Sequence, residues 1–252
     1  MNPAIDARPW RRRARPLLGT LVEVGIGTAG VEPDAAIERA FAALLDVQRC
    51  LSRFDPGSDL SRFHALPAGE SLRVRPSTRA VLAAARELQQ ASGGDFDISL
   101  GSAPRGWQLE GDLLTKLDAA TRLDSGGIAK GHAVDCAVLA LQGAGCTAGW
   151  VNAGGDLRAF GDIDVPVQLR DEVHGGTRPF ASVRQAAFAT SHFAAGSRDR
   201  LAGRGPARDL RAHVSVAAPL CLWADALTKI VALRGCAADP LLARYGASAW
   251  QH

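Results

Sequence analysis

Hydrophobic and polar positions along the chain predict a mixture of helices and strands. Residues 17–26 alternate apolar with small or polar side chains, as a half-buried strand does. Apolar residues recur at helical spacing in two Ala-rich stretches, residues 35–51 and 76–92, and two glycines end the second. A short helix is predicted over 60–65, with Ser58 or Asp59 as its cap. The same patterns predict a hairpin over 107–123, helices over 131–143 and 224–233, and strands over 165–169, 181–183 and 214–216.

This order of elements lacks the regular strand–helix alternation of a doubly wound sheet, so it favours an α+β fold. The sequence shows neither an internal repeat nor a linker, which predicts a single integrated unit over residues 17–252. Residues 1–16 are rich in arginine and predict a flexible basic N-terminus, with an electrostatic arm for an anionic partner as the alternative. The Gly-, Arg- and Asp-rich segment 196–211 predicts an exposed loop.

Composition narrows the class of protein. The chain has 252 residues and 47% hydrophobic content, enough for one large core or two small ones. Its net charge of +3, from 29 basic and 26 acidic residues, is too balanced to predict nucleic-acid binding. No window approaches the roughly 20 apolar residues of a membrane span, and no signal peptide is recognisable. The five cysteines form no CxxC pair, so we expect reduced thiols and a cytoplasmic protein. Nothing in the sequence indicates an oligomeric state.

The richest chemistry lies in residues 123–135, called the glycine run below. Gly126, Gly127 and Gly131 allow backbone N–H groups to approach a ligand, and a helix predicted just after them directs its positive end the same way. Lys130 adds a point charge suited to a phosphate. The glycine spacing fits neither a Walker loop nor a GxGxxG fingerprint. The glycine run therefore predicts a polyanion site of another kind.

Taken singly, each of the other polar clusters is weak evidence for a functional site. Asp124 or Asp135 could cap a helix, and Asn152 and Asp156 could be turn residues. Asp225 could be a carboxylate that interacts with a helix dipole.

Taken in chain order, these clusters resemble the ApbE family, the FAD:protein FMN transferases. The glycine run and the Asn-x-Gly-Gly-Asp piece, residues 152–156, are together highly specific for this family. The matching pieces are residues 18–20, 52–55, 58–63, 94–99, 124–131, 152–156, 189–191, 215–216 and 224–227.

The resemblance implies an ApbE-like, T-fold-related architecture of mixed sheets packed with helices. It implies an enzyme that binds FAD as substrate, transfers FMN to a Thr or Ser hydroxyl of a target flavoprotein, and releases AMP. Lys130 and Asp225 would be the catalytic residues, and Asp97 or Asp124 would shape the pocket. Magnesium would be held by the Ala129 carbonyl, Asp225 and Thr228. The residues implied to bind FAD are Gly19, Thr20, Ser52, Phe54, Asp97, Gly126, Gly127, Ile128, Lys130, Asn152, Gly154, Gly155 and Asp156.

Two departures from the family pattern bear on the chemistry. Family members usually carry Thr four residues after the metal-binding Asp, where this chain has Lys229, a fixed positive charge that could replace or weaken the metal. Between Ser191 and Ser215 the chain lacks the family's His-x-x-Asp-Pro segment. Two further hypotheses therefore stay open beside flavin transfer: an FAD pyrophosphatase that gives FMN and AMP, and a flavin-binding module without catalysis.

Overall fold

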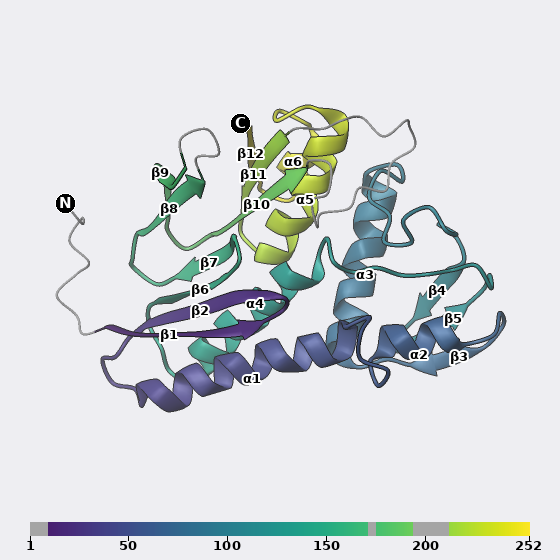
Figure 1. The fold of residues 1–252 in the computed structure, drawn as a ribbon, viewed down its shortest axis with the longest axis horizontal. Coiled ribbons are helices and arrows are strands. Elements are labelled where there is room, and N and C mark those ends of the chain that lie inside the picture. Colours follow the sequence, from purple (N-terminus) through teal and green to yellow (C-terminus); the bar gives the residue numbers. More distant parts are fainter. Residues whose placement is uncertain (1–9, 171–174, 194–211) are drawn as a thin grey trace.

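A computed structural model describes residues 10–170, 175–193 and 212–252 (Figure 1). Within these residues the main sheet is antiparallel throughout and has seven strands in the order β1-β2-β6-β7-β10-β11-β12. Its strands are β1 (Trp10–Leu17), β2 (Thr20–Gly27), β6 (Gly149–Ala153), β7 (Asp156–Phe160), β10 (Ala187–Phe193), β11 (Ala212–Ala218) and β12 (Ser248–Gln251).

Three helices cover one face of this sheet (Figure 1). Helix α1 (Pro33–Leu51) packs on β2 and on α4 (Ala129–Gly143), and α5 (Cys221–Arg234) packs on α4, β10 and β11. The apolar stripe predicted for the first helix is buried, with Ile37 and Leu44 fully inside the core. The structure thus confirms the α+β class, with helices packed against an antiparallel sheet.

A smaller group of elements lies beside the main sheet, at the right of Figure 1. It contains α2 (Asp59–Ala65), α3 (Pro76–Ala91) and a three-stranded sheet of β3 (Ser71–Arg73), β5 (Leu113–Lys116) and β4 (Trp107–Glu110). Leu72, Leu114 and Trp107 from this group belong to the same hydrophobic core as Val24 of the main sheet. One core therefore spans both groups, as a single integrated unit requires.

A second hairpin covers the other side of the main sheet. The hairpin of β8 (Val165–Arg170) and β9 (Thr177–Val183) contributes to a second apolar cluster that contains Leu157 and Phe188 of the main sheet. Helix α6 (Leu241–Arg244) leads into β12.

The basic N-terminus needs correction. Residues 10–17 form β1, an ordered strand paired along its whole length with β2, so the prediction of a flexible segment is wrong for that part. Cross-strand and helix-borne carboxylates hold the arginines: Arg12 pairs with Glu23, and Arg15 with Glu38. Residues 1–9 and the predicted loop 196–211 lie outside the described residues.

One predicted strand, residues 17–26, is in fact the second half of a hairpin. Leu18 and Gly19 form its two-residue turn, with φ of 54° and 72°. Two consecutive positive φ values are typical of the tight turns whose twist matches antiparallel strands. Leucine rarely adopts such a φ, which is why the sequence does not indicate a turn there.

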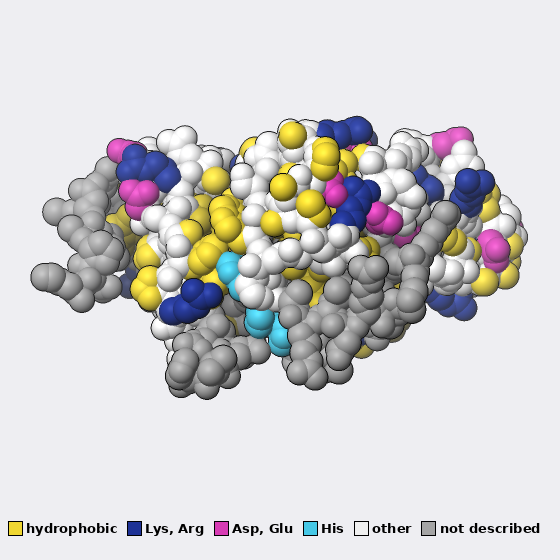
Figure 2. All heavy atoms as spheres, turned by 90° about the horizontal axis from the view of Figure 1, so that it is seen from above, with side chains coloured by type: hydrophobic (Ala, Val, Ile, Leu, Met, Phe, Trp, Pro, Cys, Tyr) yellow, Lys and Arg dark blue, Asp and Glu magenta, His cyan; other side chains and the backbone are white. Residues whose placement is uncertain are grey.

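The charged surface is mixed. On the face shown in Figure 2, Lys and Arg side chains lie beside Asp and Glu side chains at several places. This distribution agrees with the small net charge and offers no support for nucleic-acid binding on that face. Across the described part of the chain, no helix has the length and apolar character needed to cross a membrane.

Candidate functional site

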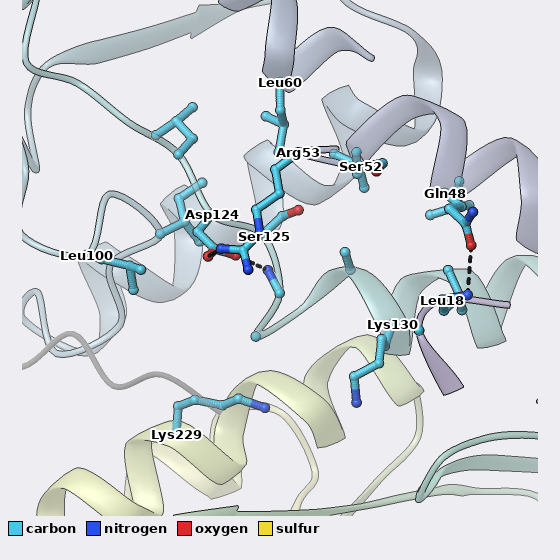
Figure 3. A pocket seen from close by; sticks show the side chains of 18 of the residues that line it. Leu18, Gln48, Ser52, Arg53, Leu60, Leu100, Asp124, Ser125, Lys130 and Lys229 are labelled. Carbon is cyan, nitrogen blue, oxygen red and sulfur yellow. Dashed lines mark hydrogen bonds and ion pairs between the residues drawn. The ribbon is translucent and has the colours of Figure 1, made fainter. Parts of the chain in front are cut away.

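A cavity of about 920 Å³ opens between α1, the glycine run, the β6–β7 turn and α5 (Figure 3). Segments from residue 18 to residue 233 line it, so the fold gathers pieces that are far apart in the sequence. The predicted site residues that line it are Gly19, Thr20, Ser52, Phe54, Asp97, Gly126, Gly127, Ala129, Lys130 and Gly154.

The glycine run forms one wall of this cavity and continues into the first two turns of α4. The Asp124 carboxylate accepts a hydrogen bond from Gly126 N at 2.9 Å, and the Ser125 carbonyl accepts one from Ala129 N at 2.8 Å. The N-terminus of α4 therefore lies at the cavity, where its backbone dipoles favour an anion. Ile128 is fully buried and belongs to the core, so it does not line the cavity as predicted.

Two turns of the main sheet supply the neighbouring wall. Gln48 of α1 accepts a hydrogen bond from Leu18 N at 2.7 Å and thereby fixes the β1–β2 turn. Gly154 has φ of 63°, and a Cβ there would lie 2.3 Å from Thr20 Oγ1, so the two turns can meet only because Gly154 has no side chain.

Of the rest of the Asn-x-Gly-Gly-Asp piece, Ala153 lines the cavity, whereas Asn152, Gly155 and Asp156 do not. Asn152 lies in β6, and its side chain accepts a hydrogen bond from Gly155 N at 3.1 Å, so it stabilises the β6–β7 turn, close to the simpler alternative for it. Asp156 lies behind the cavity wall with 1% of its surface exposed.

The rim of the cavity carries an exposed aromatic ring and an arginine. Phe54 is 82% exposed, and the Arg53 guanidinium lies over its ring at 4.8 Å. Arg53 also contacts Asp124 at 3.2 Å, which joins the end of α1 to the glycine run (Figure 3). Asp97 accepts hydrogen bonds from Ser99 N and Oγ at 2.8 and 2.7 Å, so it shapes its own loop, which lines the cavity.

Two ammonium groups extend into the same region of the cavity, Lys130 from α4 and Lys229 from α5 (Figure 3). Lys130 Nζ pairs with Asp156 Oδ2 at 2.7 Å. Burial and the nearby charge of Asp225 raise the pKa of Asp156 to about 6, against the opposing effect of Lys130 and Lys229. The Lys130 ammonium thus lies between a buried carboxylate and the cavity.

Asp225 is buried beneath Lys229. Lys229 Nζ contacts Asp225 Oδ1 at 2.5 Å, and Gly131 N donates to Asp225 Oδ2 at 3.2 Å. Burial opposes ionisation of Asp225, but the positive charges of Lys229 and Lys130 outweigh it and lower its pKa. Both oxygens of this carboxylate therefore have donors from within the protein.

The ligand set predicted for magnesium does not fit this arrangement. Asp225 and Thr228 are buried behind the cavity wall, and the Thr228 hydroxyl donates to the Asp225 carbonyl at 2.7 Å and contacts Ser191 Oγ at 2.9 Å. Only Ala129 of the three lines the cavity. Mg²⁺ requires oxygen ligands turned toward it, whereas the Asp225 carboxylate accepts from Lys229 and from the Gly131 amide.

A buried carboxylate also fixes α4 against α5. Asp135 of α4 accepts hydrogen bonds from Cys221 N and Leu222 N, both at 2.9 Å, at the start of α5. It therefore caps α5 from a neighbouring helix, and Arg158 pairs with it at 2.8 Å. Asp135 thus caps a helix, as one of the two predicted alternatives, but the helix it caps begins 86 residues away, and no local pattern indicates that partner.

Sequence reasoning missed other lining residues. Arg53 lay unassigned between Ser52 and Phe54, although a cation inside a binding motif is a usable signal. Gln48, a polar residue beside the apolar stripe of α1, gave a weaker one.

A family model described as the ApbE family matches this chain over residues 18–113 and 103–249. A curated FAD:protein FMN transferase from Rhodobacter capsulatus is 30% identical over 205 residues. That match covers 67% of this chain, and the chain spans 39% of the length of that relative.

Solved structures share the fold at lower identity. The flavin transferase ApbE of Vibrio cholerae superposes with a TM-score of 0.81 at 19% identity, covering 97% of this chain and 93% of that one. The apo form of the Pseudomonas stutzeri flavinyl transferase ApbE gives 0.80 at 22% identity, covering 99% and 92%. An ApbE protein from Thermotoga maritima gives 0.76 at 20% identity, covering 90% and 87%.

Proposed function

The chain belongs to the ApbE family, and from that premise we propose that it binds FAD in this cavity and transfers the FMN half to a hydroxyl of a target flavoprotein. The observation that supports this most strongly is that the glycine run, which the family shares, lines the cavity. The glycine run supplies backbone donors, a helix N-terminus and the Lys130 ammonium at one wall. A cavity of about 920 Å³ is at the upper end of the range for small-molecule sites, as a dinucleotide requires.

The transfer breaks the phosphoanhydride bond of the FAD pyrophosphate and forms a phosphate ester to the acceptor. The acceptor hydroxyl oxygen forms a bond to the FMN phosphorus, and the bond from that phosphorus to the bridging pyrophosphate oxygen breaks. AMP leaves with the electron pair, and the hydroxyl proton passes to solvent or to the leaving phosphate. Such a reaction depends on position and on neutralised charge more than on covalent participation by the protein.

The residues of the cavity are suited to these tasks. Lys130 and Lys229 would neutralise the pyrophosphate from the inner wall, and Arg53 would do so from the rim. The exposed ring of Phe54 could stack on a flavin or adenine ring at the opening. In this proposal Lys130 is the catalytic residue at the phosphates, and Asp225, also predicted to be catalytic, instead positions Lys229.

The test is product analysis with purified protein and FAD, with and without a flavoprotein that carries an acceptor Thr or Ser. AMP release that requires the acceptor, together with an acceptor mass increased by FMN, is the expected result. AMP and FMN release without acceptor would identify a pyrophosphatase instead. Tight FAD binding with no AMP in either reaction would leave a flavin-binding module. Absence of FAD binding would disprove the proposal.

We also propose that the protein acts in the cytoplasm. None of its five cysteines forms a disulfide, and four of them are buried or half-buried. Unpaired thiols of this kind are typical of a reducing compartment.

A further inference from the structure

Lys229 lies in a pocket of oxygen atoms that resembles a cation site. Its Nζ contacts Asp225 Oδ1 at 2.5 Å, the Asp225 carbonyl at 3.0 Å and Ser191 Oγ at 3.1 Å. Only 4% of the residue is exposed, yet it lines the cavity beside the glycine run. A buried ammonium persists only when paired and hydrogen-bonded, and here one carboxylate, one carbonyl and one hydroxyl meet that need.

The presence of a lysine at position 229, rather than an arginine, supports its role as the cation of this site. Of the 29 basic residues in the chain, 26 are arginines and only Lys116, Lys130 and Lys229 are lysines. Two of these three line the cavity. An ammonium is a compact point charge, whereas a guanidinium is a broad planar fork, so a small pocket of oxygens accepts lysine better.

The glycine run is shaped around this lysine. A Cβ on Gly127 would lie 3.2 Å from Lys229 Cε, so the absence of a side chain at Gly127 leaves room for the lysine stem. The stem passes the backbone of the run, and the charge lies over Asp225. The wall that faces a ligand phosphate thus has an ammonium group without any added ion.

We propose that the Lys229 ammonium is the built-in cation of this site: it occupies the position between Asp225 and the cavity where a divalent ion would sit, so the protein binds the FAD pyrophosphate without Mg²⁺. The FAD part of this statement rests on the proposed function, whereas the exclusion of a divalent ion does not. A divalent ion near Asp225 would have to displace the ammonium or approach it against like-charge repulsion.

The exclusion of a divalent ion is tested first on the unaltered protein without flavin. Mn²⁺ is titrated in place of Mg²⁺ and its free concentration is followed by electron paramagnetic resonance. We expect no Mn²⁺ site that depends on Asp225. A bound Mn²⁺ in the natural protein that disappears in Asp225→Asn would overturn the proposal, and this comparison does not require any variant of Lys229 to fold.

A second experiment measures FAD binding by calorimetry in EDTA and in MgCl₂. For the natural protein we expect the same Kd within about twofold in both buffers. Lys229→Met keeps the stem and removes the charge, and should weaken binding in EDTA at least about tenfold, the effect of losing one charge-assisted contact. Lys229→Thr introduces the hydroxyl that family members usually carry at this position, and this variant should bind FAD in a Mg²⁺-dependent manner.

Lys116→Met is the matched control, because Lys116 is also buried but donates to the His64 and Leu66 carbonyls away from the cavity. Its FAD affinity should match that of the natural protein. Loss of FAD binding by the natural protein in EDTA, restored by MgCl₂, would overturn the proposal. If FAD binds in neither buffer, the proposed function fails instead, and the Mn²⁺ titration still decides whether the ammonium excludes a divalent ion.

Discussion

At the residue scale, the inner wall of the cavity depends on two pairs of opposite charges. Lys130 pairs with Asp156, and Lys229 with Asp225, in adjoining parts of α4, β7 and α5. The two carboxylates are almost completely buried, whereas the ammonium groups reach the cavity. The carboxylates thus hold the cations in place, and the cations face a ligand.

Lys130→Ala should weaken FAD binding by about 10- to 100-fold, because it removes one charge-assisted contact to phosphate, worth about 1.5 to 3 kcal/mol. Calorimetric titration with FAD measures the change. Arg73→Ala is the control, because Arg73 pairs with Asp112 on the surface and does not line the cavity. Equal affinities of the natural protein and the Lys130 variant would remove Lys130 from the binding site.

Asp156 should make the protein less stable as pH rises, whereas a typical carboxylate with a lowered pKa makes it more stable. Its folded pKa is raised from 3.8 to about 6, so between these values the native state keeps a proton that the unfolded state releases. The stabilisation is therefore complete below about pH 4 and is lost as pH rises through about 6. The shift corresponds to about 1 to 3 kcal/mol.

The comparison that isolates this effect uses Asp156→Asn, which stays neutral at every pH. Urea unfolding at intervals from pH 4 to pH 7 gives the free energy of unfolding of both proteins. The variant should gain about 1 to 3 kcal/mol relative to the natural protein over that range. A difference that stays flat with pH would show that the pKa of Asp156 is not raised.

At the element scale, the site depends on how closely α4 approaches α5. A Cβ at Gly131 would lie 2.3 Å from the Cys221 carbonyl oxygen, a backbone atom that cannot turn aside. The amide of Gly131 also donates to Asp225, so the close approach positions the carboxylate that holds Lys229.

Gly131→Ala should therefore lower the free energy of unfolding by about 2 kcal/mol or more, although alanine is the better helix former. Gly143→Ala in the same helix is the matched control: Gly143 is exposed and a Cβ there meets nothing within 4 Å. That variant should be neutral or more stable by up to about 1 kcal/mol. Thermal and urea unfolding measure the stability of the two variants. Equal changes in the free energy of unfolding would contradict the steric argument.

Elements with local signals were predicted well. The first long helix was predicted from its apolar stripe and begins at Pro33, and Ser58 caps α2 as one of the two predicted alternatives. Strand β1 was missed because its arginines resemble a solvated tail until β2 supplies Glu23 across the hairpin. Pairing between strands is a tertiary property, and a local pattern does not contain it.

The same limit explains which parts of the site were predicted. The glycine run and Lys130 carry their chemistry in adjacent residues, so their sequence alone indicates a polyanion site. The environment of Lys229 depends on Ser191, which is 38 residues away on β10. Only the packing of α5 on β10 shows that the predicted metal ligands instead surround an ammonium group.

At the scale of the whole molecule, the cavity joins elements from both groups of the fold. Its lining runs from the β1–β2 turn through the end of α1 and the glycine run to α5. A ligand that fills it would contact all of these elements at once. Binding should therefore stabilise the molecule as a unit rather than one element of it.

FAD at about 100 times its Kd should add about 2.7 kcal/mol to the free energy of unfolding and raise Tm by roughly 5 to 10 °C. Hydrogen exchange with and without FAD locates that gain. We expect slower amide exchange in residues 18–20, 52–54 and 124–130 together, and little change in strands β8 and β9, whose described residues do not line the cavity. At the same FAD concentration, Lys130→Ala should show a smaller gain in the free energy of unfolding, a smaller rise in Tm and less slowing of amide exchange. Protection confined to one of these segments would mean that FAD does not bridge them, and the cavity would then not be the binding site.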